Sequence, residues 1–201
     1  QTTDLVGNNK GDYLSFTPNS QEIPPATFNS DKYVVTDMKI FRPSLHTFGG
    51  VKAPAEIIIS HSNITARGTL LVCVPIKTGE TINNTATILD TIVDQVAKLA
   101  PTSGSSTGNI SLPTFTFGQI IPVKPYYNYK GTLPYSPCNG DYQYIVYSMD
   151  DAVPMTNTAF KAFIEGNKES YTKSTQVLHP NLVAYFVENG ACKFSDKEEI
   201  E

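Results

Sequence analysis

Short runs of apolar residues, separated by turn residues, cover most of the chain. Three runs are rich in β-branched residues and bounded by Pro, Gly or Asn: Tyr33–Ile40, Ala55–His61 and Thr69–Pro75. A fourth run, Tyr142–Tyr147, alternates polar or aromatic with apolar residues. Gly49-Gly50, between the first two runs, suits the tight connection of an antiparallel pair. The pattern predicts a mostly antiparallel β domain.

Two segments have a helical period instead. In the first, 84–99, apolar residues recur at helical spacing with charged residues opposite. A shorter helix is predicted over 157–164, between Pro154 and Gly166, because Gly commonly follows the last turn of a helix. Segment 101–109 is rich in Ser, Gly and Thr and predicts a flexible connection. The chain is therefore expected to be an α+β domain with peripheral helices.

Size and charge narrow the class of protein. The 201 residues fit one domain with a sizeable core. Only 17% of residues are charged, against about a quarter in a typical domain, and the net charge is -4. No basic run offsets that charge, so we expect no nucleic-acid partner. No stretch approaches the roughly 18 apolar residues of a membrane span. The acidic end is interpreted as a polar tail over 191–201, after a domain over 1–190.

The cysteines and glycosylation motifs leave the cellular compartment open. Cys73 lies in an apolar run and is expected to be a buried free thiol, whereas Cys138 and Cys192 could pair with each other or with a segment outside this sequence. The sequence has three Asn-x-Ser/Thr motifs, which matter only in a glycosylating compartment. They begin at Asn63, Asn83 and Asn109.

Two stretches carry a resemblance to a known family. Met38–Thr47 reads MKIFRPSLHT, and Ala55–His61 reads AEIIISH. They resemble the metal-binding core of the α-type carbonic anhydrases, where the corresponding patterns are Phe-His-Phe-His-x-Pro-Ser-Glu-His-Thr and Glu-ϕ-His-ϕ-ϕ-His. Aligned without a gap, the three zinc histidines of the family fall on Lys39, Phe41 and Ile58.

A later motif strengthens the resemblance. Tyr126–Cys138 reads YYNYKGTLPYSPC, and it is similar to the family signature Tyr-Tyr-x-Tyr-x-Gly-Ser-Leu-Thr-Thr-Pro-Pro-Cys. The resemblance covers about residues 5 to 165. It implies a large central, mainly antiparallel twisted sheet with peripheral helices. It also implies that an N-terminal part of the family domain is absent from this sequence.

The resemblance implies that the catalytic chemistry of the family has been lost. Zinc sites in hydrolytic enzymes use three protein donors and an open fourth position. Phe41 and Ile58 have no donor atom, and Lys39 is a poor substitute for an imidazole. The gatekeeper Thr of the family falls on Pro134, which has neither a hydroxyl nor an N–H. Similarly, the next Thr falls on Tyr135 and the Glu that supports the gatekeeper falls on Leu45. We therefore expect no enzymatic activity, no metal and no cofactor.

The histidines are predicted to serve the scaffold. The chain has three, His46, His61 and His179, and the first two coincide with family histidines that do not bind zinc. His61 is three residues from Ile58, so in a strand the two side chains point to opposite faces. We expect His46 and His61 to be hydrogen-bonded structural residues.

Strand parity predicts how the vacated active-site floor is filled. Asp37, Lys39 and Phe41 share one face of their strand, and Glu56, Ile58 and Ser60 share one face of the next. A buried carboxylate without a partner is costly. We therefore predict that Lys39 pairs with Glu56 or Asp37 while Phe41 and Ile58 plug the floor; the alternative is that Lys39 extends up the cleft into water.

Two functions remain once catalysis is set aside. The first is a structural module that assembles with other protein subunits, because silent domains of this family occur as virion surface proteins of large DNA viruses and as receptor ectodomains. The second is a cell-surface adhesin for a glycan or protein receptor, as in poxvirus relatives that bind sulfated glycosaminoglycans. A sulfated glycan needs a basic groove, but the chain has 15 basic and 19 acidic residues. The sequence therefore favours assembly, at a virion or an extracellular surface, with residual zinc lyase activity the least favoured reading.

Overall fold

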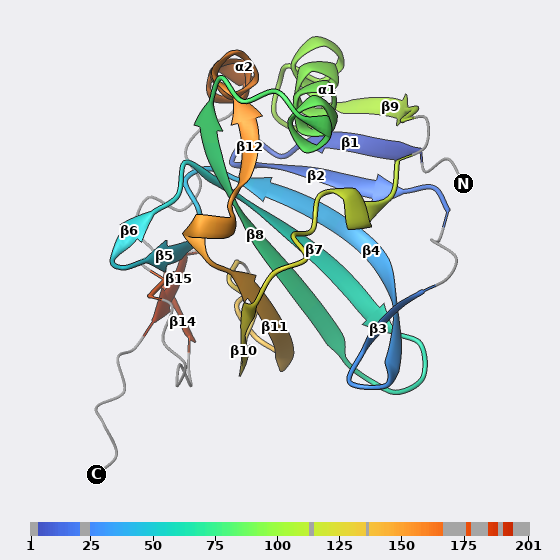
Figure 1. Cartoon of the computed structure of the whole chain (residues 1–201), viewed down its shortest axis with the longest axis vertical. Helices are drawn as coiled ribbons and strands as arrows, with labels where there is room; N and C mark the ends of the chain where they lie inside the picture. Colours follow the sequence, from blue (N-terminus) through green and yellow to red (C-terminus); the bar gives the residue numbers. More distant parts are fainter. Residues whose placement is uncertain are drawn as a thin grey trace.

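The computed structural model describes residues 4–20, 25–112, 115–135 and 137–166, and the backbone alone at 176–177, 185–188 and 191–194. One large twisted sheet forms the centre of the fold, with two helices at one end of it (Figure 1). The strands of this sheet are β1 (Leu5–Asn9), β2 (Tyr13–Pro18), β3 (Ala26–Phe28), β4 (Asp31–Phe41), β7 (Ala55–Asn63), β8 (Thr69–Gly79), β9 (Ser106–Ile110), β10 (Tyr126–Gly131), β11 (Tyr142–Tyr147) and β12 (Val153–Thr156).

The remaining elements are short, apart from the two helices. They are β5 (His46–Phe48), β6 (Val51–Lys52), α1 (Asn84–Leu99), the 3-10 turns η1 (Phe117–Gln119) and η2 (Met149–Asp151), α2 (Asn157–Gly166), β13 (Gln176–Val177), β14 (Tyr185–Glu188) and β15 (Ala191–Phe194). The predicted helix over 84–99 is confirmed in both of its bounds. No helix among the described residues is long and apolar enough to cross a membrane.

The order of the strands in the sheet is β10-β11-β8-β7-β4-β2-β1-β9. The pairs β4–β7 and β7–β8 at its centre are antiparallel, whereas β11 and β12 both run parallel to β8. The expected mainly antiparallel twisted sheet with peripheral helices is confirmed, and within this large sheet the parallel pairs among the described strands are those of β8 with β11 and β12.

Alternating side chains divide the centre of the sheet into two apolar faces. On β7, Ile57 and Ile59 point to one face, while Ile58 points to the other. The first face carries the helix-side cluster. It consists of buried apolar residues from this face of the sheet and from both helices, including Ile57, Ile59, Leu89, Ile92, Val96 and Phe163. The opposite face carries the floor cluster, which consists of Phe41, Leu45, Ile58, Leu71, Cys73, Tyr135, Tyr144 and Val146.

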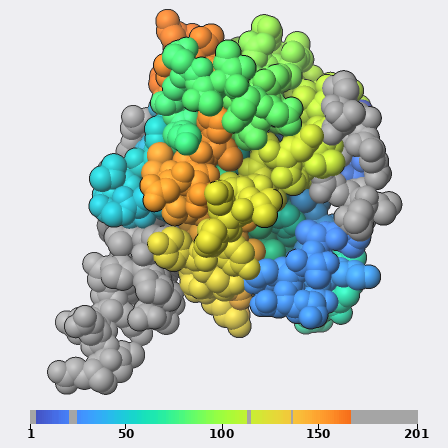
Figure 2. Space-filling model, in the orientation of Figure 1, coloured from blue at the N-terminus to red at the C-terminus, as the bar shows by residue number. Residues whose placement is uncertain are grey.

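Helices and a long connection cover the helix-side cluster. The apolar stripe of α1 packs there through Leu89, Ile92 and Val96, and the side chain of Asn83 caps the helix by accepting a hydrogen bond from the Ala86 N–H. The segment between β9 and β10 crosses this face of the molecule in Figure 2 and contributes Phe117 to the same cluster. This face is therefore a conventional apolar interior.

The structure corrects three details of the sequence analysis. Gly49-Gly50 does not join β4 to β7 directly; it forms the turn of the small hairpin β5–β6, where both glycines have positive φ. The predicted flexible connection 101–109 contains most of β9, because its backbone pairs with β1 at the sheet edge although its side chains are mostly exposed. Finally, the segment 191–201 begins with a strand, β15, paired with β14.

Candidate functional site

The residues expected at the floor of the site lie on adjacent strands of the sheet. Lys39 of β4 is in register with Ile58 of β7, and Phe41 is in register with Glu56. All four side chains belong to the face that carries the floor cluster, as parity predicts. The sheet therefore brings together the positions that the sequence resemblance selects.

Apolar side chains fill two of these positions. Phe41 and Ile58 are both fully buried. The ring of Phe41 stacks on Tyr135 with centroids 5.4 Å apart and lies against Tyr13 with centroids 5.0 Å apart. Aromatic pairs at these separations have the attractive offset geometry. The floor is thus closed by a three-ring stack, with Ile58 beside it in the same cluster.

The third position, Lys39, forms an ion pair. Its Nζ lies 2.6 Å from Asp37 Oδ1, and Ser60 Oγ donates to the same oxygen at 3.0 Å. The ammonium also lies 5.1 Å from the centroid of the Tyr135 ring, within the range of a cation–π contact. The Lys39 side chain is 12% exposed. The predicted pairing with Asp37 is confirmed, and the alternative of a lysine extended into water is wrong.

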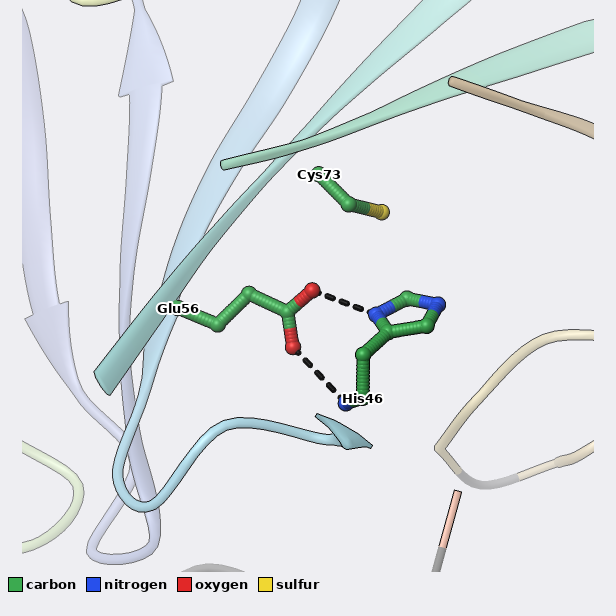
Figure 3. A group of neighbouring side chains, drawn as sticks. All are labelled: His46, Glu56 and Cys73. Carbon is green, nitrogen blue, oxygen red and sulfur yellow. Dashed lines mark hydrogen bonds and ion pairs between the residues drawn. The ribbon is translucent and has the colours of Figure 1, made fainter. Parts of the chain in front are cut away.

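Glu56 is held by different partners from those predicted (Figure 3). Its Oε2 accepts hydrogen bonds from the backbone N–H of Leu45 at 2.8 Å and of His46 at 3.0 Å, and its Oε1 pairs with His46 Nδ1. Among the described residues, therefore, His46 and the backbone compensate the buried carboxylate, and the predicted pairing with Lys39 is wrong. The reason is register, because Glu56 lies opposite Phe41 whereas Lys39 lies opposite Ile58.

The two described histidines are hydrogen-bonded, as predicted. His46 Nε2 lies 2.7 Å from the hydroxyl of Tyr129. On the other face of the sheet, His61 Nδ1 donates to the Ile59 carbonyl at 3.1 Å, and burial lowers the pKa of His61 below its ordinary value. His179 lies outside the described residues. Sequence reasoning missed the contact of His46 with Glu56 because β5 is placed against β7 only by the tertiary fold.

The loop after β10 packs against the floor cluster. Pro134 and Tyr135 are buried, and the Tyr135 hydroxyl is hydrogen-bonded to Ser60. Burial raises the pKa of Tyr135 far above its ordinary value, so the phenol stays protonated at neutral pH. Leu45 is buried in the floor cluster. These three positions present apolar surface and one bound hydroxyl to the floor.

Cys73 is buried, whereas the asparagines of the glycosylation motifs are exposed or partly exposed. Cys73 is a buried free cysteine, as predicted, and burial raises its pKa well above the ordinary value. Cys138 is disulfide-bonded. The side chain of Cys192 lies outside the described residues, so pairing with Cys192 and pairing with a segment outside this sequence both stay predictions. The three motif asparagines lie at or near the surface: Asn63 at the end of β7, Asn83 at the N-cap of α1 and Asn109 on β9.

A shallow pocket of mixed charge lies at the end of the sheet opposite the helices. It is lined by residues that include Asp31, Arg67, Lys130 and Asp141. The two cations and two carboxylates leave it without a positive excess. A purely anionic ligand has no electrostatic advantage in this pocket.

Comparison with solved structures identifies the fold. The chain is similar to a carbonic anhydrase from Chlamydomonas reinhardtii in complex with acetazolamide, with 17% identity over 89% of this chain and 74% of that one and a TM-score of 0.67. It is similar to an α-carbonic anhydrase from Aspergillus oryzae, with 18% identity over 85% and 70% and a TM-score of 0.67. It is also similar to dioscorin complexed with ascorbate, with 15% identity over 90% and 71% and a TM-score of 0.67. The protein therefore has the α-carbonic anhydrase fold. No family model matches the chain, and no curated protein matches its sequence.

The three residues that the sequence resemblance aligns with the zinc histidines do not fit a zinc ion. Two of them, Phe41 and Ile58, offer no lone pair and are packed in the floor cluster. The Nζ of the third, Lys39, is engaged by Asp37. A cation placed among these three side chains would meet an ammonium group and hydrocarbon. No catalytic step through zinc can be derived at these positions.

Proposed function

We propose that this protein is a non-catalytic carbonic anhydrase-like module that serves a structural or assembly role, as a capsid-associated or surface protein of a large DNA virus. The observation that supports the proposal is the floor cluster. Two of the three positions that the sequence resemblance aligns with the zinc histidines hold buried apolar side chains, Phe41 and Ile58, and the third holds Lys39, which is paired with Asp37. A carbonic anhydrase needs a metal that lowers the pKa of a bound water to about 7.

A sheet edge with exposed aromatic residues supports contact with other proteins. Among the described strands, β10 pairs with β11 alone. Tyr126 and Tyr127 on β10 are 46% and 55% exposed, and Val123 just before the strand is 99% exposed. An open edge with tyrosines offers both backbone hydrogen bonds and large contact area to a partner chain. We therefore place the contact with neighbouring subunits at β10.

Composition supports a viral or extracellular setting. The chain is rich in Asn, Thr and Tyr, it has no Trp, and only 17% of its residues are charged. Such a surface is polar without being strongly charged, which suits packing into a crowded shell of protein. The three exposed or partly exposed Asn-x-Ser/Thr motifs are compatible with a surface location.

The second candidate is an adhesin that binds a glycan or a protein receptor. The pocket that contains Arg67 and Lys130 is the observation in its favour, since it is open and polar. Asp31 and Asp141 in the same pocket oppose binding of a sulfated glycan, because sulfate is held by unopposed Arg and Lys. A protein receptor would avoid this objection. We rank adhesion below assembly for that reason.

The loss of catalysis is tested by assay of carbon dioxide hydration. The purified protein is assayed without zinc and after refolding with zinc, with an active α-carbonic anhydrase as the positive control. We expect no turnover above the uncatalysed rate in either form. Bicarbonate production that depends on added zinc would overturn the proposal.

Assembly and adhesion are separated by two measurements on the same preparation. Lys124 lies just before β10, Lys130 lies in β10, and Lys98 lies on α1. Cross-linking in the native particle or tissue should join Lys124 and Lys130 to other protein subunits more often than Lys98. Retention on heparin or chondroitin columns is measured in parallel. A monomer without cross-links at β10 that binds either column would favour the adhesin instead.

A further inference from the structure

Three residues with metal-binding side chains meet beneath the floor, next to the positions of the family zinc ligands. Cys73 of β8 is in register with Ile58 of β7, and Glu56 lies two residues from Ile58 on the same face. His46 of β5 approaches from the side, joined to Glu56 by hydrogen bonds from its backbone and its ring. Figure 3 shows the carboxylate, the imidazole and the thiol facing a common point. Their ligand atoms lie within 4.8 Å of one another, and all three residues are buried.

We propose that His46, Glu56 and Cys73 form a binding site for a thiophilic divalent cation of the Zn²⁺ class. One imidazole nitrogen, one carboxylate oxygen and one thiolate sulfur are a donor set typical of zinc, with bonds of about 2.0–2.3 Å. Donors around such an ion are about 3.5 Å apart, so Cys73 has to approach the other two, and His46 Nδ1 and Glu56 Oε1 have to move apart from their hydrogen-bond contact. Side-chain rotations or a small strand adjustment supply these movements.

Charge balance favours the cation. Glu56 is fully buried beside Cys73, which belongs to the apolar floor cluster. A dication with one carboxylate, one thiolate and a neutral imidazole has no net charge, which lowers the cost of burial. The apolar surroundings therefore suit a neutral metal complex.

The protons can be accounted for at stated atoms. The Cys73 thiol releases its proton to solvent as the sulfur binds the cation. The cation takes the place of the Nδ1 proton of His46, which is donated to Glu56 in the metal-free protein; that proton leaves to solvent and Nε2 takes up one proton, so the imidazole stays neutral. The Nε2–H then donates to the Tyr129 oxygen, 2.7 Å away.

The proposed site is structural. Three protein donors leave one position, which a water molecule completes, and none of the three residues has appreciable solvent-accessible surface. Substrate cannot reach the cation in the folded state. The inference is thus independent of the proposed function, because zinc held here without bicarbonate turnover leaves that proposal intact.

Refolding with metal removes the barrier that burial places on entry of the ion. The protein is unfolded in urea and refolded with Co²⁺ or Zn²⁺, and excess metal is removed. We expect about one equivalent of bound metal, a thiolate-to-cobalt charge-transfer band in the near ultraviolet, and a higher unfolding temperature than the metal-free protein. Absence of the band in the wild type would overturn the proposal.

Two variants locate the site. Cys73→Val keeps a small apolar side chain and removes the sulfur, so we expect the band to disappear and metal affinity to fall more than tenfold. Leu71→Val changes the same face of the same strand and keeps the thiol, so it should retain the band. Equal metal binding by Cys73→Val and the wild type would place the metal elsewhere and overturn the assignment.

Discussion

The two faces of the central sheet differ in what they bury. The helix-side cluster is closed by apolar residues of α1, α2 and the segment after β9. The floor face carries apolar side chains as well, but it also buries Glu56 and His46 and half-buries an ion pair between Lys39 and Asp37. The comparison teaches that one face is stabilised mainly by hydrophobic burial, with His61 as a buried polar side chain, whereas the other buries a network of polar groups whose partners must all be present.

The largest effect is expected from the buried carboxylate of the floor face. Glu56→Ala removes the acceptor for two backbone N–H groups and for His46 Nδ1. We expect the free energy of unfolding to fall by about 3–5 kcal/mol, since buried donors are left without partners. Urea unfolding at pH 7 measures the loss. Glu56→Gln, which keeps an acceptor oxygen, is the control and should lose less.

A matched pair of core substitutions compares the faces directly. Ile57 and Ile58 are neighbours on β7, both fully buried, and they point to the helix-side cluster and the floor cluster respectively. Substitution of either by Ala should lower the free energy of unfolding by about 2–5 kcal/mol. Similar losses are expected because both faces are filled. A much smaller loss for Ile58→Ala would mean that the floor is open to water.

His61 makes the stability of the helix-side face depend on pH. Burial lowers its pKa in the folded state below the unfolded value of about 6.5. The stabilisation is therefore present above that value and is lost as the pH falls through the window between the unfolded and the folded pKa. The slope reaches at most about 1.4 kcal/mol per pH unit for one proton. Unfolding titrations between pH 7.5 and 5 measure it, and the slope should be flatter in His61→Gln.

The smallest effect is expected from the ion pair of the floor face. Lys39→Met removes the partner of Asp37 but leaves the hydrogen bond from Ser60. We expect a loss of about 1 kcal/mol in the free energy of unfolding, because the pair is only partly buried. A double-mutant cycle with Asp37→Asn isolates the coupling between the two side chains. A cycle energy near zero would show that the pair contributes nothing to the floor.

The sequence predicted the elements better than their assembly. Apolar spacing placed α1 from Asn84 to Leu99, and alternation on β7 separated Ile57 from Ile58. It did not predict β9, because a strand of small polar residues at a sheet edge has no periodic apolar signal. Its backbone hydrogen bonds with β1, which decide the structure, leave no trace in local composition.

The candidate site shows the same division. Residue identity excludes zinc at Phe41 and Ile58, since no environment gives hydrocarbon a lone pair. Identity and parity also limited the partners of Lys39 to a few residues on one face. The choice of Asp37 over Glu56 then depended on register, which fixes which side chains lie within hydrogen-bonding distance.

The sequence alone determined much of the strand and helix pattern, the sides of the sheet on which side chains lie, and the absence of donor atoms at Phe41 and Ile58. The tertiary structure decided that His46 satisfies Glu56 and that Cys73 joins them, because β5, β7 and β8 contribute one residue each across 28 positions of chain. Local periodicity fixes the direction of a side chain within its own strand. Packing of separate strands fixes which side chains it meets.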